Sequence, residues 1–382
     1  MLVVKQNKKR KGGQLKPIKI IISGGGTGGH IFPAIAIANA FKILRPNTEF
    51  LFVGAEGRME MEKVPAAGYK IEGLWISGLQ RKLTLSNLFF PFKVLSSLLK
   101  AKKIIKNFKP DIAIGTGGFA SGPTLQVASG RGIPTLIQEQ NSYPGITNRI
   151  LSKKVNKICV AYTGMEKYFP KEKIILTGNP VRQDILEIDG KREIALTHFG
   201  LNSGKKTILV IGGSLGARAI NESIQNCIET FQKSNIQLIW QTGKSFYPQA
   251  QQSVATYSDK GIKAFDFIST MNLAYAAADI VISRAGASSI SELCLVQKPS
   301  ILIPSPNVAE DHQTKNAMAL VNINAAIFIK DSEAKDKLCS IAIELINNAN
   351  QCKMLGDNIA KLAFKESAAV IANEILKLVE KK

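Results

Sequence analysis

The feature that most restricts the fold of this chain is a strand-like run followed by a glycine-rich loop and a helical pattern, and it occurs in both halves. Ile18–Ile22 is mostly isoleucine, and it leads through the loop 23–30 (Ser-Gly-Gly-Gly-Thr-Gly-Gly-His) into the helical pattern Ala34–Leu44. Thr207–Ile211 leads in the same way through the loop 212–217 into a second helical pattern. Strand, loop and helix in this repeated order predict parallel sheets with helices on both faces.

The chain has 382 residues, which is enough for two domains, and the strand–loop–helix order restarts after Pro180. Met1–Lys16 is basic, and the apolar run after it is too short for a signal peptide, which predicts a solvated tail. The helical pattern at the end of the chain is expected to pack back on the first domain. We therefore predict four segments: the basic tail 1–16, a first domain 17–181, a second domain 182–356 and a C-terminal helix 357–382.

Cysteine content and charge limit the compartment and the partners. The five cysteines are scattered without a Cys-x-x-Cys pair, which is typical of a reduced, cytosolic protein. Fifty Lys and Arg against 29 Asp and Glu give a net charge of +21, which favours nucleic acid, a phosphorylated substrate or an anionic membrane surface as partner. We exclude nucleic acid, because the sequence has neither an aromatic strand platform nor a recognition helix.

Much of the positive charge lies between Glu72 and Asp111, a stretch without an acidic residue. Basic residues there are mixed with leucine and phenylalanine, and the apolar positions 85, 88, 89 and 92 have helical spacing. This combination is typical of a helix on a membrane surface, although a core helix with a solvated basic face has the same pattern. The predicted membrane patch consists of Leu79, Arg81, Lys82, Leu85, Leu88, Phe89 and Phe92.

A glycine loop between a strand and a helix presents backbone N–H groups at the positive end of the helix, which suits a diphosphate. The structural alternative is a tight turn without a ligand. Gly24–Gly29 also fits the G-x-G-x-x-G dinucleotide pattern, with Glu56 after the next strand in the place of the ribose ligand. A single NAD site, however, does not account for the second glycine loop.

His30 ends the first loop, where the positive end of the helix is expected to keep its imidazole neutral. A neutral imidazole accepts a proton, or bonds an anion after taking one up, and ordering of the loop is the structural alternative. The chain has only three histidines (His30, His198 and His312) and no Asp-x-Asp pair. We therefore expect no metal and no cofactor, with phosphates bound by helix ends and arginine.

Ser289–Glu292 has the Ser-x-x-Glu spacing of a capping box, which would stabilise the start of a helix. Alternatively, the Glu292 carboxylate accepts hydrogen bonds from both hydroxyl groups of a ribose. The preceding turn Arg284–Ala287 is a third glycine-containing helix start, which supports the second interpretation. Spacing alone leaves both interpretations open.

Several longer motifs follow one another in a specific order. They are Gly25–Ala34, Ile76–Leu79, Gly117–Pro123, Glu139–Asn141, Gly178–Arg182, Gly212–Arg218 and Asp311–Gln313. Together they resemble the MurG family, the N-acetylglucosaminyltransferases that act on undecaprenyl-diphosphate-linked muramoyl-pentapeptide in peptidoglycan synthesis. The resemblance extends from about Lys19 to the end of the chain.

The resemblance implies an α/β chain with the GT-B fold, in which two Rossmann-like doubly wound domains face a cleft. It implies inverting, metal-independent transfer of GlcNAc from UDP-GlcNAc to the C4 hydroxyl of the muramoyl sugar, which converts lipid I to lipid II. The first domain would bind the acceptor and the membrane, and the second would bind the donor. The family also implies a peripheral location on the cytoplasmic side of the inner membrane and contacts with the cell-wall and division machinery.

Carried over to matching positions, the resemblance assigns residues to both substrates. The UDP-GlcNAc contacts are Thr27, Gly28, Gly29, Asn141, Arg182, Ser214, Ile268, Ala287, Ser288, Ser289, Ile290, Ser291, Glu292 and Gln313. Among these, the Ile268 backbone would hold the uracil, Glu292 the ribose and Gln313 the GlcNAc hydroxyls. His30 is the candidate on the acceptor side, as catalytic base or as a contact to the lipid diphosphate, and Glu139 is a second candidate base.

Two other functions share these features. Another GT-B lipid glycosyltransferase would have the same nucleotide-binding half and the same basic patch. A non-catalytic, membrane-bound nucleotide-sugar-binding protein would keep the glycine loops without the chemistry. Transfer of GlcNAc to the lipid-linked muramoyl-pentapeptide is the property that separates the three.

Overall fold

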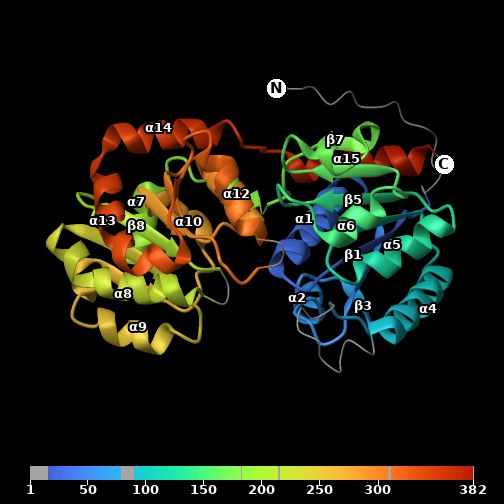
Figure 1. The fold of residues 1–382 in the computed structure, drawn as a ribbon, viewed down its shortest axis with the longest axis horizontal. Helices are drawn as coiled ribbons and strands as arrows, with labels where there is room; N and C mark the ends of the chain where they lie inside the picture. Colours follow the sequence, from blue (N-terminus) through green and yellow to red (C-terminus); the bar gives the residue numbers. More distant parts are fainter. Residues whose placement is uncertain (1–15, 79–89, 182, 214–215, 309–310, 382) are drawn as a thin grey trace.

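The computed structural model describes residues 16–78, 90–181, 183–213, 216–308 and 311–381. These residues form two α/β units that lie side by side, each built around one β-sheet (Figure 1). All strand pairs of the two sheets are parallel. The predicted class, parallel sheets with helices on both faces, is therefore confirmed.

The first unit contains seven strands in the order β3-β2-β1-β4-β5-β6-β7. They are β1 Lys19–Gly24, β2 Glu49–Ala55, β3 Lys70–Leu74, β4 Ile112–Gly117, β5 Thr135–Glu139, β6 Lys157–Val160 and β7 Ile174–Leu176. The α-helices of this unit are α1 Gly28–Leu44, α2 Glu60–Ala66, α4 Phe90–Phe108, α5 Ser121–Gly130 and α6 Ile146–Leu151. The strand order reverses between β1 and β4, and doubly wound sheets bind their ligands outside the carboxyl ends of the strands at such a point.

The second unit contains six strands in the order β10-β9-β8-β11-β12-β13, with the reversal between β8 and β11. They are β8 Lys206–Ile211, β9 Ile236–Gln241, β10 Ile262–Phe265, β11 Ile280–Ser283, β12 Ser300–Leu302 and β13 Ile327–Phe328. The helices that follow β7 are α7 Arg192–Phe199, α8 Arg218–Lys233, α9 Tyr247–Val254, α10 Met271–Ala277, α11 Ala287–Val296, α12 His312–Val321, α13 Ala334–Asn347, α14 Ala349–Ala360 and α15 Ser367–Glu380. Short 3₁₀ helices are η1 Met165–Lys167, η2 Lys171–Lys173, η3 Gln183–Leu186, η4 Ser258–Lys260 and η6 Asp331–Glu333.

Strand β1 shows why each sheet needs helices on both faces. Ile20, Ile21 and Ile22 are fully buried. Ile20 and Ile22 pack in the core that contains α1, whereas Ile21 packs in the core that contains α4. Successive side chains of a strand point to opposite faces, so a run of isoleucine suits a strand that is covered on both sides.

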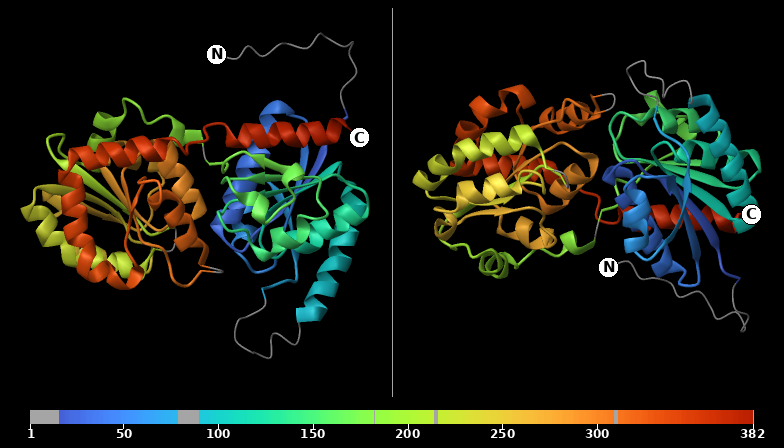
Figure 2. Two further views of the ribbon diagram at one scale, coloured as in Figure 1. Left: turned by 45° about the horizontal axis from the view of Figure 1, so that its top comes forward. Right: turned by 90° about the horizontal axis from the view of Figure 1, so that it is seen from below.

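The end of the chain returns to the first unit. Helix α14 ends at Ala360, and α15 packs against α1. Both views of Figure 2 show this C-terminal helix, in red, on the first unit. Ile371, Ala372 and Ile375 of α15 are buried in the same core as Phe41 of α1. The boundary that the sequence suggested between 356 and 357 falls inside α14, which continues without interruption through this position.

Helix α4 contains the only described residue of the predicted membrane patch, Phe92. The other six patch residues fall in the segment 79–89, outside the residues that the structure describes. Phe92, Leu95 and Leu99 of α4 are exposed. Among the described helices, none combines the length and the apolar character that a membrane span requires.

Candidate active site between the two sheets

The first glycine loop packs backbone against backbone with the loop after β4. The Gly25 N–H donates to the Gly117 carbonyl at 3.3 Å. Gly118 has φ +83°, and a Cβ atom at this position would lie only 2.3 Å from the Gly25 carbonyl oxygen. Glycine is therefore required here both by the backbone conformation and by the close approach of the second loop.

A buried carboxylate, Glu60 on α2, holds the same loop from its other side. It accepts hydrogen bonds from the backbone N–H groups of Gly26 and Ala55, each at 2.9 Å. A side chain at Gly25 would collide with this carboxylate, because its Cβ would lie 2.0 Å from Glu60 Oε1. Glu60 is absent from the predicted site, because only burial distinguishes it from the other acids of Glu56–Glu62.

Helix α1 begins at Gly28, ahead of the predicted helix body Ala34–Leu44, so the end of the glycine loop forms its first turn. Thr27 is the N-cap residue with an extended backbone, and its carbonyl accepts the Ile31 N–H at 3.2 Å. The N–H groups of Gly28 and Gly29 precede the first hydrogen bonds along the helix. These N–H groups therefore form the positive end of α1, where an anion binds favourably.

His30 lies in this first turn and is half-buried. Its Nδ1 atom is 3.0 Å from Gln140 Oε1, and its backbone carbonyl accepts the Thr116 hydroxyl at 2.9 Å. Burial lowers the pKa of the imidazole below its ordinary value of 6.5 and outweighs the hydrogen bond to Gln140, which raises it. The imidazole is thus favoured in its neutral form, with burial rather than the helix end as the main cause.

Glu139, the second candidate base, is buried at the end of β5. One carboxylate oxygen accepts from the backbone and side-chain N–H groups of Asn141 at 3.0 and 3.2 Å. The other accepts from the Gly145 N–H at 3.2 Å and from Asn148 Nδ2 at 2.9 Å. Burial raises the pKa of Glu139, and these donors oppose that effect. The geometry therefore suits a carboxylate that orders the loop 139–148.

The ordered loop reaches the second unit. Asn316 on α12 accepts from the Ser142 N–H and hydroxyl at 3.0 and 3.1 Å, and its own Nδ2 donates to Asn141 Oδ1 at 3.1 Å. The Lys315 ammonium lies 3.3 Å from the centre of the Tyr143 ring. Asn141, a predicted sugar contact, is therefore held beside the helix that begins next to Gln313.

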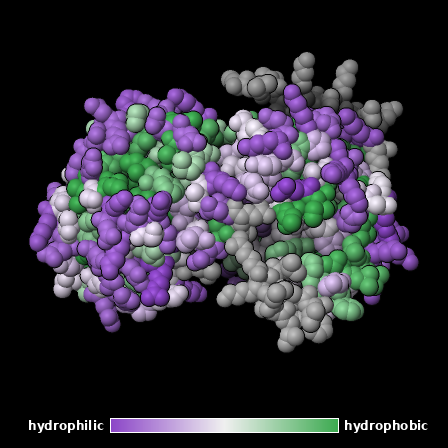
Figure 3. Space-filling view, in the orientation of Figure 1, coloured by the Kyte–Doolittle hydropathy of each residue, from purple (hydrophilic) through white to green (hydrophobic). Residues whose placement is uncertain are grey.

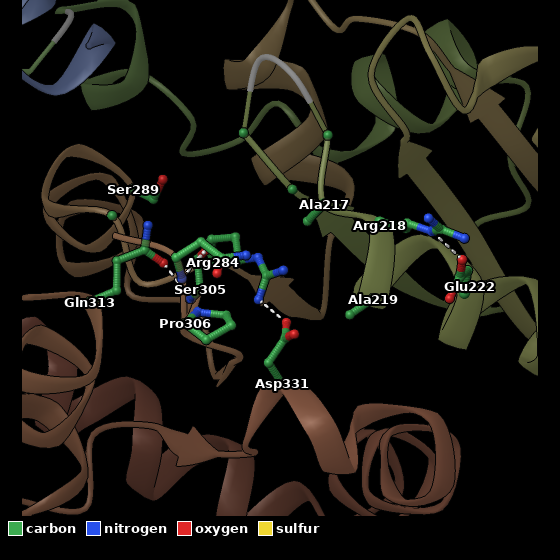
Figure 4. Close-up of a pocket in the computed structure, with 15 residues that line it drawn as sticks. Ala217, Arg218, Ala219, Glu222, Arg284, Ser289, Ser305, Pro306, Gln313 and Asp331 are labelled. Atoms are coloured by element: carbon green, nitrogen blue, oxygen red, sulfur yellow. Dashed lines mark hydrogen bonds and ion pairs between the residues drawn. The ribbon is translucent and has the colours of Figure 1, made fainter. Parts of the chain in front are cut away.

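In the second unit, a cavity of about 590 Å³ lies where the loop after β8 meets the starts of α8 and α11 (Figure 4). Its lining includes Gly213, Gly286 and two predicted donor contacts, Ser289 and Gln313. The Gln313 side-chain oxygen accepts the Ser305 N–H at 2.9 Å, which orients the amide. Two helix starts that open into one polar cavity suit a diphosphate.

Arginine supports the wall of this cavity. Arg284 forms an ion pair with Asp331 and donates to the carbonyls of Ile303 and Pro304 at 3.0 and 3.1 Å. Figure 4 shows the guanidinium directed toward Asp331. Because these bonds join the ends of β11, β12 and β13, Arg284 acts as a structural link of the cavity rather than as an exposed charge.

Ile268, the predicted uracil contact, is buried, and its N–H donates to Gln241 Oε1 at 2.9 Å. The Gln241 Nε2 atom in turn donates to the Gly213 carbonyl at 3.2 Å. Gln241 thus connects the loop after β8 with the segment after β10. It is absent from the predicted site, because nothing in the sequence distinguishes it from other glutamines at strand ends.

The capping-box interpretation of Ser289–Glu292 is wrong. Helix α11 begins at Ala287 with Gly286 as its N-cap residue, so Ser289 lies inside the helix. Glu292 instead accepts a hydrogen bond from the Tyr275 hydroxyl at 2.9 Å. Four-residue spacing cannot show where a helix starts, and here the start is set by the glycine turn before it.

The predicted donor contacts lie on three helices. The start of α1 carries Thr27, Gly28 and Gly29. Helix α11 carries Ala287, Ser288, Ser289, Ile290, Ser291 and Glu292, and α12 carries Gln313. The Ser291 hydroxyl is linked to the first unit, because it accepts from Asn179 Nδ2 at 3.0 Å. Arg182 and Ser214 fall outside the described residues. Within the described part of the chain, no group of three or more His, Cys, Asp or Glu side chains is arranged to hold a metal ion.

Comparison with known proteins extends these observations. Family models for the N-terminal and C-terminal domains of glycosyltransferase family 28 match residues 20–160 and 207–374. The Phocaeicola vulgatus protein named UDP-N-acetylglucosamine–N-acetylmuramyl-(pentapeptide) pyrophosphoryl-undecaprenol N-acetylglucosamine transferase is 59% identical over 95% of this chain and 97% of its own length. The protein of that name from Flavobacterium psychrophilum is 57% identical over 96% of this chain and 99% of its own.

A solved structure gives the same result. The crystal structure of Acinetobacter baumannii MurG matches 94% of this chain and 100% of its own, with a TM-score of 0.74 and 26% sequence identity. Two parallel-sheet units with a polar cavity at the strand ends, together with these matches, define a glycosyltransferase of the GT-B fold. The chain belongs to glycosyltransferase family 28 and, within it, to the MurG family, as its motifs implied.

Proposed function

We propose that this chain transfers GlcNAc from UDP-GlcNAc to undecaprenyl-diphosphate-linked muramoyl-pentapeptide, the reaction that names its relatives. The observation that carries the proposal is the hydrogen bond between Asn316 and Asn141 at 3.1 Å. It joins the loop after β5 in the first unit to α12, which begins beside Gln313 in the cavity of the second unit. A nucleotide sugar in that cavity would extend its sugar toward residues of both units.

The donor diphosphate is proposed to lie near the starts of α8 and α11, because helix starts stabilise anions. Glu292 would accept from the ribose hydroxyls while the Tyr275 hydroxyl orients its carboxylate. The Ile268 N–H already donates to Gln241, so a uracil at this position would bond to the Ile268 carbonyl. Arg182 and Ser214 are proposed to contact the diphosphate region because they lie in the motifs Gly178–Arg182 and Gly212–Arg218.

The proposed transfer is a single displacement with inversion. The acceptor C4 oxygen forms a bond to C1 of GlcNAc, the bond from C1 to the UDP oxygen breaks, and the acceptor hydroxyl proton passes to a base. His30 suits the base, because burial favours its neutral form. Glu139 suits it less, because both of its oxygens accept hydrogen bonds from the loop that it orders. The charge that develops on UDP would be stabilised by the helix starts.

We also propose that the first unit attaches to an anionic membrane through one face of α4. Phe92, Leu95 and Leu99 have the spacing of a single helix face and are 65%, 58% and 60% exposed. Lys102, Lys103 and Lys106 are exposed further along the helix. Figure 3 shows hydrophobic surface in the region that α4 occupies in Figure 1. Apolar and basic side chains together bind anionic lipid surfaces.

This attachment would place the enzyme peripherally on the cytoplasmic side of the inner membrane, where the lipid-linked acceptor is anchored. The first unit would then take the acceptor, and the second unit would take the donor. We propose contacts with the cell-wall and division machinery from membership of the family alone.

Transfer from radiolabelled UDP-GlcNAc to lipid-linked muramoyl-pentapeptide tests the function directly. We expect label in the lipid fraction with the wild-type protein. The His30→Ala variant should bind UDP as well as the wild type and give much less label. Donor binding without transfer would refute the proposal in favour of a binding protein. Transfer to diacylglycerol but not to the muramoyl acceptor would indicate another lipid glycosyltransferase.

A further inference from the structure

A series of side-chain hydrogen bonds starts at His30 and continues through buried amides. His30 Nδ1 is 3.0 Å from Gln140 Oε1. Gln140 Nε2 donates to the backbone carbonyls of Thr116 at 2.8 Å and Gln138 at 3.1 Å, and it also contacts the Gln138 side-chain oxygen. The two carbonyls determine how the Gln140 amide must be oriented.

The direction of each bond follows from the chemistry of the atoms. Backbone carbonyls only accept hydrogen bonds, so the NH₂ group of Gln140 faces Thr116 and Gln138. The Gln140 amide oxygen then faces the imidazole, and because this oxygen cannot donate, His30 Nδ1 must carry the hydrogen. A neutral imidazole has one N–H, which leaves Nε2 with the free lone pair. The reversed amide would set its oxygen against two carbonyl oxygens.

Neighbouring amides keep Gln140 in this orientation. Gln138 Nε2 donates to Asn179 Oδ1 at 2.9 Å, and Asn179 Nδ2 donates to the Gln140 carbonyl and to the Ser291 hydroxyl, each at 3.0 Å. Gln138, Gln140 and Asn179 are buried. A rotated amide in this group would leave buried donors and acceptors unpaired, which is unfavourable.

We propose that Gln140 is a positioning residue that holds neutral His30 in the Nδ1–H tautomer, so that Nε2 is the nitrogen that accepts the acceptor hydroxyl proton. This inference rests on the proposed transfer reaction and specifies which atom of His30 serves it. The proton moves from the C4 hydroxyl to Nε2 as the C4 oxygen attacks, which gives an imidazolium with both nitrogens protonated. The Gln140 oxygen then continues to accept from Nδ1–H, so the amide need not move during the reaction.

Protonation and tautomer are controlled by different groups. Burial favours the neutral ring, and Glu60 on α2 is the charged residue, among those described, whose attraction opposes this. Strand β4 contributes Gly117 and the Thr116 backbone, which is a second hydrogen-bond partner of the imidazole, and the loop after β5 contributes Gln140; none of these groups titrates. Burial therefore keeps the imidazole neutral, while Gln140 selects the nitrogen that carries the hydrogen.

Nitrogen-15 NMR of the histidine side chains in the substrate-free, full-length protein tests the tautomer without any activity. The chain has only three histidines, so a His30→Ala spectrum identifies the His30 signals. At a pH where the ring is neutral, we expect a protonated-type shift for Nδ1 and an unprotonated-type shift for Nε2. The opposite pattern in the wild-type protein would overturn the inference.

Two variants connect the tautomer to catalysis. Gln140→Met keeps the approximate shape but removes the acceptor, so we expect both tautomers in the spectrum, a kcat lowered at least about tenfold and a KM for UDP-GlcNAc within about twofold. Gln140→Glu keeps an acceptor and adds a negative charge, so the Nδ1–H form should persist while the acid limb of the kcat profile moves to higher pH. Unchanged His30 shifts in Gln140→Met would contradict the inference.

Gln237→Leu is the matched control, because Gln237 is another buried amide that bonds to a backbone, that of Asn202, at the far side of the second unit. It should lower stability without changing the His30 spectrum, and a kcat loss equal to that of Gln140→Met would count against the inference. A wild-type Nδ1–H signal without transfer would refute only the proposed reaction. Normal transfer by Gln140→Met would refute only the role of Gln140.

Discussion

Asn316 of the second unit accepts both the backbone N–H and the hydroxyl of Ser142 of the first unit, at 3.0 and 3.1 Å. This pair connects α12, which begins at the cavity of the second unit, with the loop that donates hydrogen bonds to Glu139. Asn316 therefore links the second unit to the loop after β5, and the Asn179–Ser291 hydrogen bond is another link between the two units. A substitution at Asn316 should therefore alter both α12 in the second unit and the loop 139–145 in the first.

The first prediction concerns this coupling. Asn316→Ala should raise the KM for UDP-GlcNAc about tenfold, because the Ser142 N–H and the Asn141 side chain lose their partner. Hydrogen exchange of the loop 139–145 should increase in the same variant. Asn358→Ala is the control, since its side chain donates to the Asn324 carbonyl within the second unit. Unchanged exchange of the loop would show that the interface is held by other contacts.

The second prediction concerns His30. His30→Ala should lower kcat by about 10² to 10⁴ and leave UDP binding within about twofold, because a base acts on the acceptor rather than on the nucleotide. Steady-state rates and calorimetric titration with UDP measure the two effects. His198→Ala, at an exposed histidine, serves as the control. A large loss of UDP affinity with normal turnover would contradict the assignment.

A third prediction follows from the lowered pKa of His30. Between the folded pKa and the ordinary value of 6.5, the unfolded chain binds this proton more readily than the folded chain. The stability due to neutral His30 is therefore complete above about pH 6.5 and is lost as the pH falls below it. Melting temperatures at pH 7.5 and 5.5 should differ less for His30→Gln than for the wild type. Equal differences would argue against a lowered pKa of His30 in the folded protein.

Glu139 provides the fourth prediction. Glu139→Gln replaces two accepting oxygens by one oxygen and an NH₂ group that faces N–H donors, so it should destabilise the protein by about 1–3 kcal/mol. Urea unfolding measures this loss, and hydrogen exchange should show an opened loop 139–148. Loss of activity with normal stability and an ordered loop would instead support Glu139 as the base.

The fifth prediction concerns the α4 face. Leu95→Glu with Leu99→Glu should release the protein from anionic vesicles in a flotation assay, because both side chains are exposed and their loss removes apolar area from the proposed contact. Folding should be preserved for the same reason. Ile43→Glu is the control, since Ile43 is also exposed but lies on α1. Equal binding of all three proteins would refute this surface.

Local patterns were sufficient for the class of fold and for the positions of the glycine loops. The isoleucine run of β1 predicts a strand that is covered on both faces, because successive side chains of a strand point to opposite faces and an uninterrupted apolar run places apolar groups on both. The capping box at Ser289 failed for the opposite reason. Its spacing is local, but the start of α11 at Ala287 depends on how the chain leaves β11.

Motif order was sufficient for the family, and composition was sufficient to direct attention to the stretch that includes α4. Neither could identify Glu60, Gln140, Gln241 or Asn316 as parts of the site. Each of these residues acts on a loop that is distant in sequence, and even the motif Glu139–Asn141, which contains Gln140, does not show that this amide reaches His30. Their importance depends on which loops the two sheets bring together.

The amino-acid sequence alone therefore specifies two parallel-sheet units, their glycine loops and the presence of His30 at the end of the first loop. Only the tertiary structure shows that Gln140, 110 residues further along the chain, lies within hydrogen-bond distance of the His30 imidazole, and that the Glu139 carboxylate accepts hydrogen bonds from the loop that follows it. The physical reason is that helix and strand patterns arise from neighbouring residues, whereas burial and hydrogen bonds arise where β1, β4 and β5 end at one edge of a sheet.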